Sequence, residues 1–280
     1  MLTTLIRELV DSGVHFGHRV SWWNPKMSPY IYGKRNGIHI INVKETVRGL
    51  LIAKKFVTQV VAGGHDVLFV GTKRQARQTA TQQALACGMH YVNERWLGGT
   101  LTNFRTIRSR LARLEELEGL EESGQINNYS KKMITSLTRE RRKIKRNLEG
   151  IRKMSRLPGA VFVVDCRREH LALKEARKLG IPSLGLIDTN SDPDLVDIPI
   201  PGNDDAMRTI ELVIKELVSA VEEGKAAKPD GQGKAPARRV VARVPTMARA
   251  DGSDAPADVA PAAAEASEPV AAPQENQTDA

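Results

Sequence analysis

The sequence is poor in cysteine, has no long apolar run and lacks the common catalytic motifs. Only two cysteines, Cys87 and Cys166, occur among the 280 residues, which argues against a disulfide framework and favours the reducing cytoplasm. No apolar stretch approaches the ~20 residues that cross a bilayer. The N-terminus carries acids and lacks the basic and apolar regions of a signal peptide. Neither H-E-x-x-H nor G-x-S-x-G is present, so catalysis of those kinds is not expected.

Positive charge is concentrated in one part of the chain. The formal net charge is +9, but residues 229–280 hold 5 basic and 8 acidic residues, so the preceding part carries +12. Such an excess indicates a polyanionic partner, most often nucleic acid and less often an anionic membrane surface. The alternative is a soluble protein that is simply basic.

Residues 229–280 differ in composition from the rest. This segment is rich in alanine and proline and contains almost no large apolar side chains. It cannot bury enough apolar surface to offset the entropy cost of ordering, so we expect a disordered tail.

Before the tail, short apolar runs alternate with helical patterns. We expect strands at 66–71, 160–165 and 183–188, weaker strands at 38–42 and 89–93, and helices at 43–61, 72–86, 169–179 and 204–221. Continuous apolar strands are typical of parallel sheets that are buried on both faces. The pattern predicts an α/β domain, formed by residues 1–99 and 158–228, in which helices flank a mostly parallel sheet.

Residues 100–157 interrupt this alternation. Apolar residues recur at steps of three and four on both sides of a polar turn at 121–128, which predicts a protruding antiparallel coiled-coil hairpin. The segment holds 15 basic and 7 acidic residues, and its densest run is 139–146. Because the neighbouring acids are too few to pair with these bases, we expect the hairpin to contact phosphates. The alternative is a solvated charged face.

Two connections at predicted strand ends are candidates for local roles. Gly71-Thr72-Lys73-Arg74 joins a strand to a helix, and its free N–H groups and bases suit a backbone phosphate, with Thr72 as a helix cap. It matches no nucleotide-binding motif. In the second connection, Trp96 is expected to hold the hairpin at a fixed angle and Thr100 to cap its first helix.

Histidines and aspartates offer two weaker candidates for a metal site. His15 and His18 lie three residues apart and could bind zinc together with Cys166 or His39, although only the two histidines are adjacent in sequence. A second group could hold magnesium, or could consist only of turn and cap residues. This group comprises Asp188, Asp192, Asp204 and Asp205.

The stretch 15–27, HFGHRVSWWNPKM, allows a metal site, a catalytic site or an RNA-binding surface. Its Asn-Pro pair favours a loop, and bases lie on both sides of it. We expect an extended segment that its aromatics anchor and whose bases face RNA or an adjacent protein. Whether Trp22 and Trp23 both pack inward or one meets a partner is left open.

Several long blocks, in order, resemble the family of the bacterial small-subunit ribosomal protein numbered two. They are GVHFGHRVSWWNPKMSPYIYGKRNGIHIINVKET, FVGTKRQA, NERWLGGTLTNF, LPGAVFVVD and DTNSDPDLVDIPIPGNDDA. The resemblance covers about residues 2–222. It implies a flavodoxin-like α/β domain with a protruding coiled coil, and a structural place near the junction of head and body of the small subunit. It also implies contact with small-subunit rRNA and help in retaining the large mRNA-binding ribosomal protein numbered one.

The resulting expectation is a cytoplasmic, ribosomal, non-enzymatic protein that binds rRNA and needs no cofactor beyond a possible structural magnesium or zinc ion. The expected RNA-binding residues are Arg19, Trp22, Lys26, Lys34, Arg35, Lys73, Arg74, Arg95, Arg105, Arg108, Arg139, Arg141, Arg142, Lys143, Lys145 and Arg146. Two competing hypotheses are an enzyme that acts on a phosphorylated small molecule at the sheet's carboxyl edge, and a signalling adaptor that uses the coiled coil.

Overall fold

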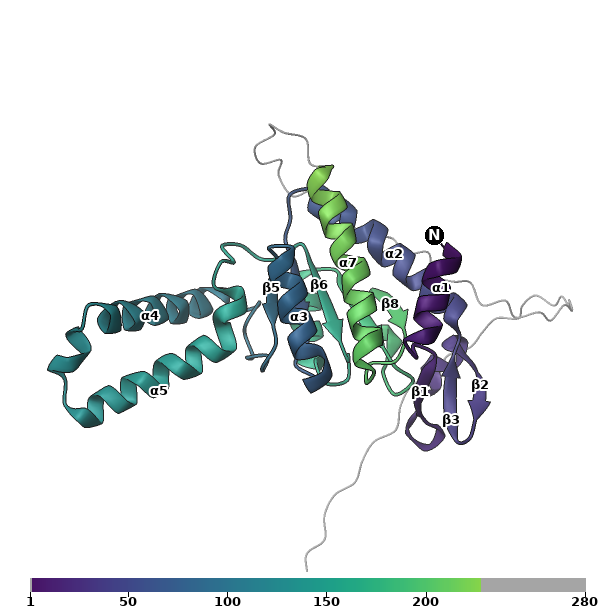
Figure 1. The fold of residues 1–280 in the computed structure, drawn as a ribbon, viewed down its shortest axis with the longest axis horizontal. Coiled ribbons are helices and arrows are strands. Elements are labelled where there is room, and N and C mark those ends of the chain that lie inside the picture. The colour runs from purple at the N-terminus through teal and green to yellow at the C-terminus, as the bar shows by residue number, and fades with distance from the viewer. Residues whose placement is uncertain (1, 228–280) are drawn as a thin grey trace, which may run out of the picture. The chain divides into compact units, whose positions relative to one another are not determined.

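The computed structural model describes residues 2–227, all within one unit of the chain, Met1–Ala237 (Figure 1). The predicted tail, residues 229–280, lies outside the described residues. None of the described helices is long and apolar enough to cross a membrane.

The larger of two sheets has five strands, all parallel. They are, in chain order, β4 (Val67–Val70), β5 (His90–Val92), β6 (Ala160–Val164), β7 (Ser183–Ile187) and β8 (Ile198–Pro201). Their order across the sheet is β5-β4-β6-β7-β8, which is 2-1-3-4-5 when the five strands are numbered along the chain. This is the flavodoxin-like order, in which the order of successive strands reverses between β4 and β6. The predicted α/β class with a parallel sheet is confirmed.

One strand of this sheet was not predicted. Pro199 and Pro201 argue against a strand because proline cannot donate to the hydrogen-bond ladder, yet β8 contains both. The strand lies at the edge of the sheet, where it pairs only with β7. Proline is tolerated at that place.

Helices cover both faces of the sheet. Val67 and Phe69 join the core beneath one layer of helices, whereas Leu68 and Val70 join the core on the opposite face, as alternation along a strand requires. The first layer consists of α2 (Val43–Ala62), α3 (Arg74–Ala86) and α7 (Met207–Ala226). The opposite face carries α6 (His170–Leu179) and apolar residues from the base of the hairpin. Because the strands are apolar on both sides, burial of these two layers dominates the stability of the domain.

The N-terminal residues build a second, antiparallel sheet that sequence patterns did not predict as a unit. After α1 (Leu2–Asp11), the strands β1 (Phe16–Arg19), β2 (Ile31–Arg35) and β3 (Ile38–Ile41) pair in the order β1-β3-β2. The short helical turns η1 (Val20–Trp22) and η2 (Pro25–Tyr30) lie between β1 and β2. Asn36 and Gly37 both have positive φ, 50° and 74°, which suits the tight turn that joins β2 to β3.

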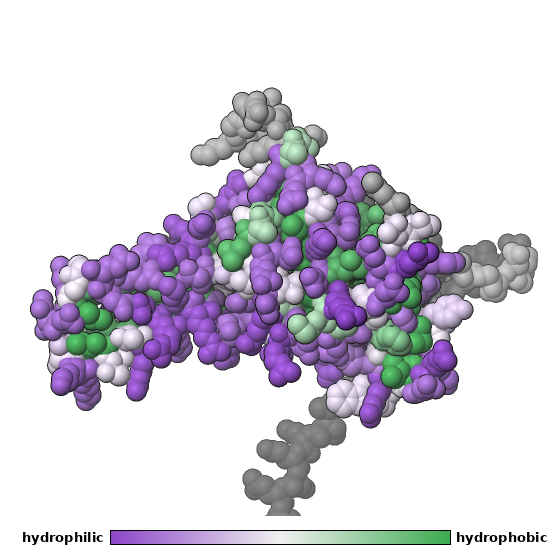
Figure 2. Space-filling model, in the orientation of Figure 1, coloured by the Kyte–Doolittle hydropathy of each residue, from purple (hydrophilic) through white to green (hydrophobic). Residues whose placement is uncertain are grey.

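The segment inserted between β5 and β6 forms two helices, α4 (Phe104–Glu122) and α5 (Lys131–Leu148), which lie side by side (Figure 1). The short turns η3 (Gln125–Asn128) and η4 (Glu149–Ile151) follow them. Leu114, Leu117 and Leu137 are buried along the hairpin. That the seam packs as a coiled coil stays a prediction. Figure 2 shows hydrophilic residues along most of the hairpin and a small apolar cluster at its far end.

Three predicted helix starts were wrong. The first hairpin helix starts after Asn103 rather than Thr100, whose hydroxyl instead donates to the Leu97 carbonyl oxygen. Helix α3 starts after Lys73, because the Thr72 hydroxyl bonds to Glu169. The last helix starts at Met207 rather than Asp204, which is buried at the sheet's carboxyl edge.

Candidate functional site

The cations of α5 fall on two stripes of the helix. Arg139, Arg142, Lys143 and Arg146 are spaced by three and four residues, so they share one face. Of these four, Arg139, Arg142 and Lys143 have no carboxylate within ion-pair distance among the described residues, whereas Arg146 pairs with Glu94 at 2.8 Å. This stripe therefore keeps most of its positive charge available for a ligand.

The second stripe is used inside the protein. Arg141 pairs with Glu121 of α4, and the Lys145 ammonium lies 3.3 Å from Glu118 of α4. The expectation that acids are too few to pair with the bases of 139–146 was therefore wrong for this stripe. Antiparallel packing brings the acids of α4 opposite these two residues, which sequence spacing alone does not show.

The remaining predicted RNA-binding residues also divide by whether they are paired. Lys26 pairs with Asp192 at 3.0 Å and with Asp194 at 2.6 Å. The following bases have no carboxylate partner in the part of the chain that the structure describes: Arg19, Lys34, Arg35, Arg74, Arg95, Arg105 and Arg108. One guanidinium N–H of Arg108 donates to the Met154 carbonyl oxygen at the base of the hairpin.

The two tryptophans of the segment 15–27 differ in their packing. Trp22 is 66% exposed, whereas Trp23 is 37% exposed and its ring centroid lies 5.0 Å from that of His39; the buried side chain of this segment is Met27. The prediction of aromatic anchors was therefore wrong for Trp22, which is available to a partner, and holds in part for Trp23. Phe16 and Tyr32 of the same small sheet are also exposed.

The carboxyl edge of the parallel sheet gathers acids around one lysine. The Lys73 ammonium lies 2.6 Å from Asp204, 2.6 Å from Asp205 and 3.8 Å from Asp165. Burial disfavours the charge of Lys73, but the adjacent carboxylates outweigh this effect and raise its pKa. Its ammonium therefore forms ion pairs with these carboxylates, whereas the sequence pattern suggested that it binds a phosphate.

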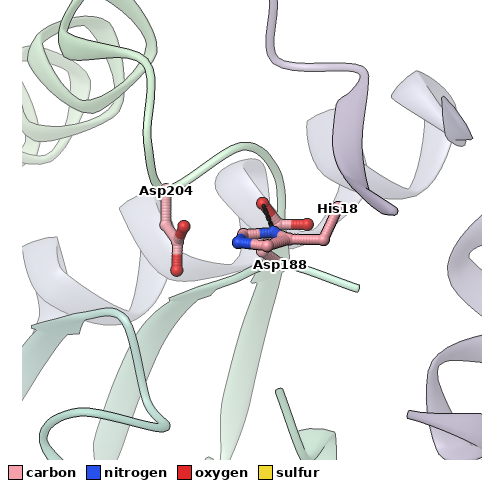
Figure 3. Close-up of side chains that lie close together, drawn as sticks. All are labelled: His18, Asp188 and Asp204. Atoms are coloured by element: carbon pink, nitrogen blue, oxygen red, sulfur yellow. Dashed lines mark ion pairs between the residues drawn. The ribbon is translucent and has the colours of Figure 1, made fainter. Parts of the chain in front are cut away.

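His18 reaches the same edge from the other sheet (Figure 3). Its Nδ1 lies 2.9 Å from Asp188 Oδ2, and its backbone N–H donates to the Thr189 hydroxyl at 2.9 Å. Gly17 makes this approach possible, because a Cβ at that position would lie 2.6 Å from Thr189 Cγ2. The Asp188 carboxylate holds the pKa of His18 above its ordinary value, against the effect of burial.

Three side chains could together hold a cation. His18, Asp188 and Asp204 each offer one ligand atom, and these atoms lie within 4.8 Å of one another (Figure 3). Asp188 and Asp204 are fully buried, and the Oδ2 atom of each has no hydrogen-bond donor among the described residues. The Asp188 Oδ2 atom is nevertheless the one that forms the 2.9 Å ion pair with His18. Burial, together with Asp188 and Asp165, raises the pKa of Asp204 to about 7.

The arrangement regroups the two predicted metal sets. It takes His18 from the zinc pair and Asp188 and Asp204 from the magnesium group, and it leaves out His15. Asp192 caps the short helical turn η5 (Pro193–Leu195), so the turn-residue alternative holds for it. Asp205 lies 3.4 Å from His18 Nε2, at the exposed rim. An imidazole and two carboxylates suit Zn²⁺, with water completing a tetrahedral site.

Several residues near the predicted RNA-binding positions were missed by sequence reasoning. Arg77, Arg168 and Glu94 lie beside the unpaired stripe of α5, and Glu175 of α6 accepts hydrogen bonds from the connection that leads into α4. These side chains come from separate helices and loops. No spacing in the sequence identifies them, because only the packing of α6 and α5 against the sheet brings them together.

Comparison with known proteins shows which family this chain resembles over most of its length. A model of the family described as ribosomal protein S2 matches residues 9–224, more than half of the chain. The chain is 59% identical over 225 residues to the small ribosomal subunit protein uS2 of Rhodopirellula baltica, with 80% of this chain and 86% of that protein covered. The protein of that name from Syntrophobacter fumaroxidans is 53% identical, with 80% and 82% covered. That of Mycolicibacterium paratuberculosis is 48% identical, with 98% and 100% covered.

The family match covers both sheets, the hairpin and the carboxyl edge. Ribosomal protein S2 is a structural family without enzymatic activity, which confirms the prediction that the chain is not an enzyme. The chain belongs to the ribosomal protein S2 family.

Proposed function

We propose that the chain is a structural constituent of the small ribosomal subunit in the bacterial cytoplasm and binds small-subunit rRNA during translation. The observation that carries this proposal is its close similarity to proteins named small ribosomal subunit protein uS2. The three unpaired cations on one stripe of α5 support it, because such charges release counterions when they meet phosphates. The net charge of +12 before the tail acts in the same direction.

Cosedimentation tests this proposal. The full chain should sediment with small subunits at low salt and be released as salt rises, because the contact is largely ionic. A chain that stays in the soluble fraction at low salt would contradict it.

A protein-binding role for the small sheet is the second part of the proposal. Phe16, Trp22 and Tyr32 are 48%, 66% and 80% exposed, and exposed aromatics are enriched at protein interfaces. A hollow of about 250 Å³ lies on the same sheet, and Trp23 and His39 contribute to its lining. This surface suits neighbouring proteins, among them the large mRNA-binding ribosomal protein numbered one that the resemblance implies.

Paired substitution separates this role from RNA binding. Trp22→Ser with Tyr32→Ser should reduce retention of that large protein on small subunits, while the bound amount of this chain stays the same. Unchanged retention would exclude this sheet as its contact.

The third part is a structural cation at His18, Asp188 and Asp204. Three carboxylates, from Asp165, Asp204 and Asp205, lie within 3.8 Å of the Lys73 ammonium, and Asp188 pairs with His18. One buried oxygen of Asp188 and one of Asp204 have no hydrogen-bond donor among the described residues. Burying several carboxylates together is costly, and a cation would reduce that cost. It would also join the small sheet to the carboxyl edge of the large one.

Thermal unfolding with added metal tests the site. Zn²⁺ should raise the melting temperature of the full chain by mass action, and Asp204→Asn should remove this effect. Asp192→Asn, which changes a half-buried turn acid that is not one of the three candidate ligands, is the control. An equal shift in both variants would show that the cation binds elsewhere.

A further inference from the structure

A groove lies between α5 and the larger sheet. Its volume is about 750 Å³, and we call it the basic groove. One wall is the stripe of α5 that carries Arg139, Arg142, Lys143 and Arg146. The other wall is formed by Arg95 and Trp96 from the connection after β5. The remaining lining is Thr72, Arg77, Glu94, Asn147, Arg168, Glu169 and Leu171.

The groove holds more positive charge than its own acids can balance. Seven of its lining residues are arginine or lysine and two are glutamate. Glu94 is already shared by Arg77 at 3.0 Å and Arg146 at 2.8 Å. Burial raises the pKa of Glu169, which also accepts the hydroxyl hydrogen bond of Thr72. Five cations have no carboxylate partner among residues 2–227: Arg95, Arg139, Arg142, Lys143 and Arg168.

The base of the groove coincides with the point where the strand order reverses. Thr72 follows β4, Glu169 follows β6, and these two strands flank the reversal. Arg168 Nε donates to the Thr72 hydroxyl at 3.0 Å, so this guanidinium is held beside the opening. In open α/β sheets, ligands bind at such a point, outside the carboxyl ends of the strands.

The dimensions favour a single strand of nucleic acid. Residues 139–146 of α5 advance by about 10 Å at 1.5 Å per residue, so this stripe can face only a few consecutive phosphates of one strand. The volume is that of a pocket for a small ligand, so a duplex could only lie across its opening. Leu171, which is 46% exposed, adds apolar lining on which a base can rest, whereas Trp96 is only 6% exposed and adds little surface.

We propose that the basic groove binds an unpaired, single-stranded segment of RNA, with phosphates on the α5 stripe and Arg168. This inference rests on the proposed function, and it assigns the contact between the chain and rRNA to the basic groove. Free phosphate compounds share the same chemistry, so the experiment must separate them from a strand.

Two double variants of the same helix provide a matched comparison. Arg142→Gln with Lys143→Gln removes two unpaired groove cations, whereas Arg141→Gln with Lys145→Gln removes two cations that pair with α4. Both change the charge by the same amount. Binding of the full chain to a fluorescent uridine hexanucleotide is measured by anisotropy over a range of salt concentrations, with circular dichroism as a check of folding.

The double variant of Arg142 and Lys143 should make the negative slope of log K against log salt shallower by about 1.4, since each phosphate contact on a single strand contributes about 0.7. The control pair should leave the slope unchanged. Equal slope changes in both pairs, or tighter binding of an RNA duplex than of the single strand, would overturn the proposal. Saturable binding of ATP that the hexanucleotide does not displace would also overturn it.

The groove can fail while the proposed function stands. If the groove pair still cosediments with small subunits and binds the hexanucleotide like the unmodified chain, the groove is rejected and the ribosomal role remains. Loss of cosedimentation by the unmodified chain itself would instead reject the proposed function.

Discussion

At the scale of single residues, Glu175 fixes the connection between the sheet and the hairpin. Its carboxylate accepts hydrogen bonds from Trp96 Nε1 at 3.1 Å and from the backbone N–H groups of Gly99, Leu101 and Thr102 at 2.8–3.1 Å. Burial alone would raise the pKa of Glu175, but these donors lower it below its usual value. The expected role of Trp96 as an anchor of the hairpin therefore depends on a partner from α6.

Glu175→Gln should destabilise the protein by about 1–2 kcal/mol at pH 7, because hydrogen bonds to a charged acceptor are replaced by weaker ones and the site is partly open to solvent. The folded-state pKa of Glu175 is lowered, so its contribution is present above the unfolded pKa of about 4.3 and is lost as pH falls through the folded value. Denaturant unfolding should therefore show a difference at pH 7 that shrinks towards pH 3. A constant difference across this range would exclude the carboxylate's charge as the cause.

Gly17 has a comparable role at the carboxyl edge. Gly17→Ala should push β1 away from Thr189, since the added Cβ would meet the stiff, branched side chain that already accepts the His18 N–H. The expected result is a smaller rise in melting temperature with Zn²⁺ than in the unmodified protein. Gly33→Ala, in the same sheet with open space around its Cβ, is the control. Equal rises in both variants would contradict this placement of His18.

At the scale of elements, the hairpin shows what sequence patterns could and could not reveal. Steps of three and four predicted both helices and their excess of bases. They could not separate the stripe containing Arg142 from the stripe containing Arg141, because the difference is set by acids of α4 that lie 20 and 27 residues away along the chain. Ion pairs between two helices depend on how the helices pack against each other, and the sequence of one helix alone does not show this packing.

Leu114→Ala tests how independent the hairpin is. Leu114 is fully buried in α4, so truncation should cost about 2–5 kcal/mol. Hydrogen exchange should become faster in α4 and α5, whereas the amides of α7 should stay protected, because different parts of a protein open as separate units. Uniformly faster exchange in all three helices would show that the hairpin and the sheet unfold together.

At the scale of the whole molecule, most of the larger sheet and its helices were predictable, whereas the grouping of His18 with Asp188 and Asp204 was not. Apolar runs such as 160–165 are long and continuous, so local pattern identifies them. His18, Asp188 and Asp204 come from both sheets and are up to 186 positions apart, and the short strands β1 and β2 that bring His18 close have little apolar pattern. The packing of the small sheet against the carboxyl edge is a tertiary contact that local sequence patterns do not predict.

The measurement that most directly tests the whole account is photo-crosslinking from two positions of α5 on intact small subunits. A photoreactive side chain is placed at Lys143, in the basic groove, or at Lys145, on the stripe that faces α4. The account predicts crosslinks to rRNA from position 143 and few from position 145. Crosslinks to rRNA from 145 alone, or from neither position, would contradict it.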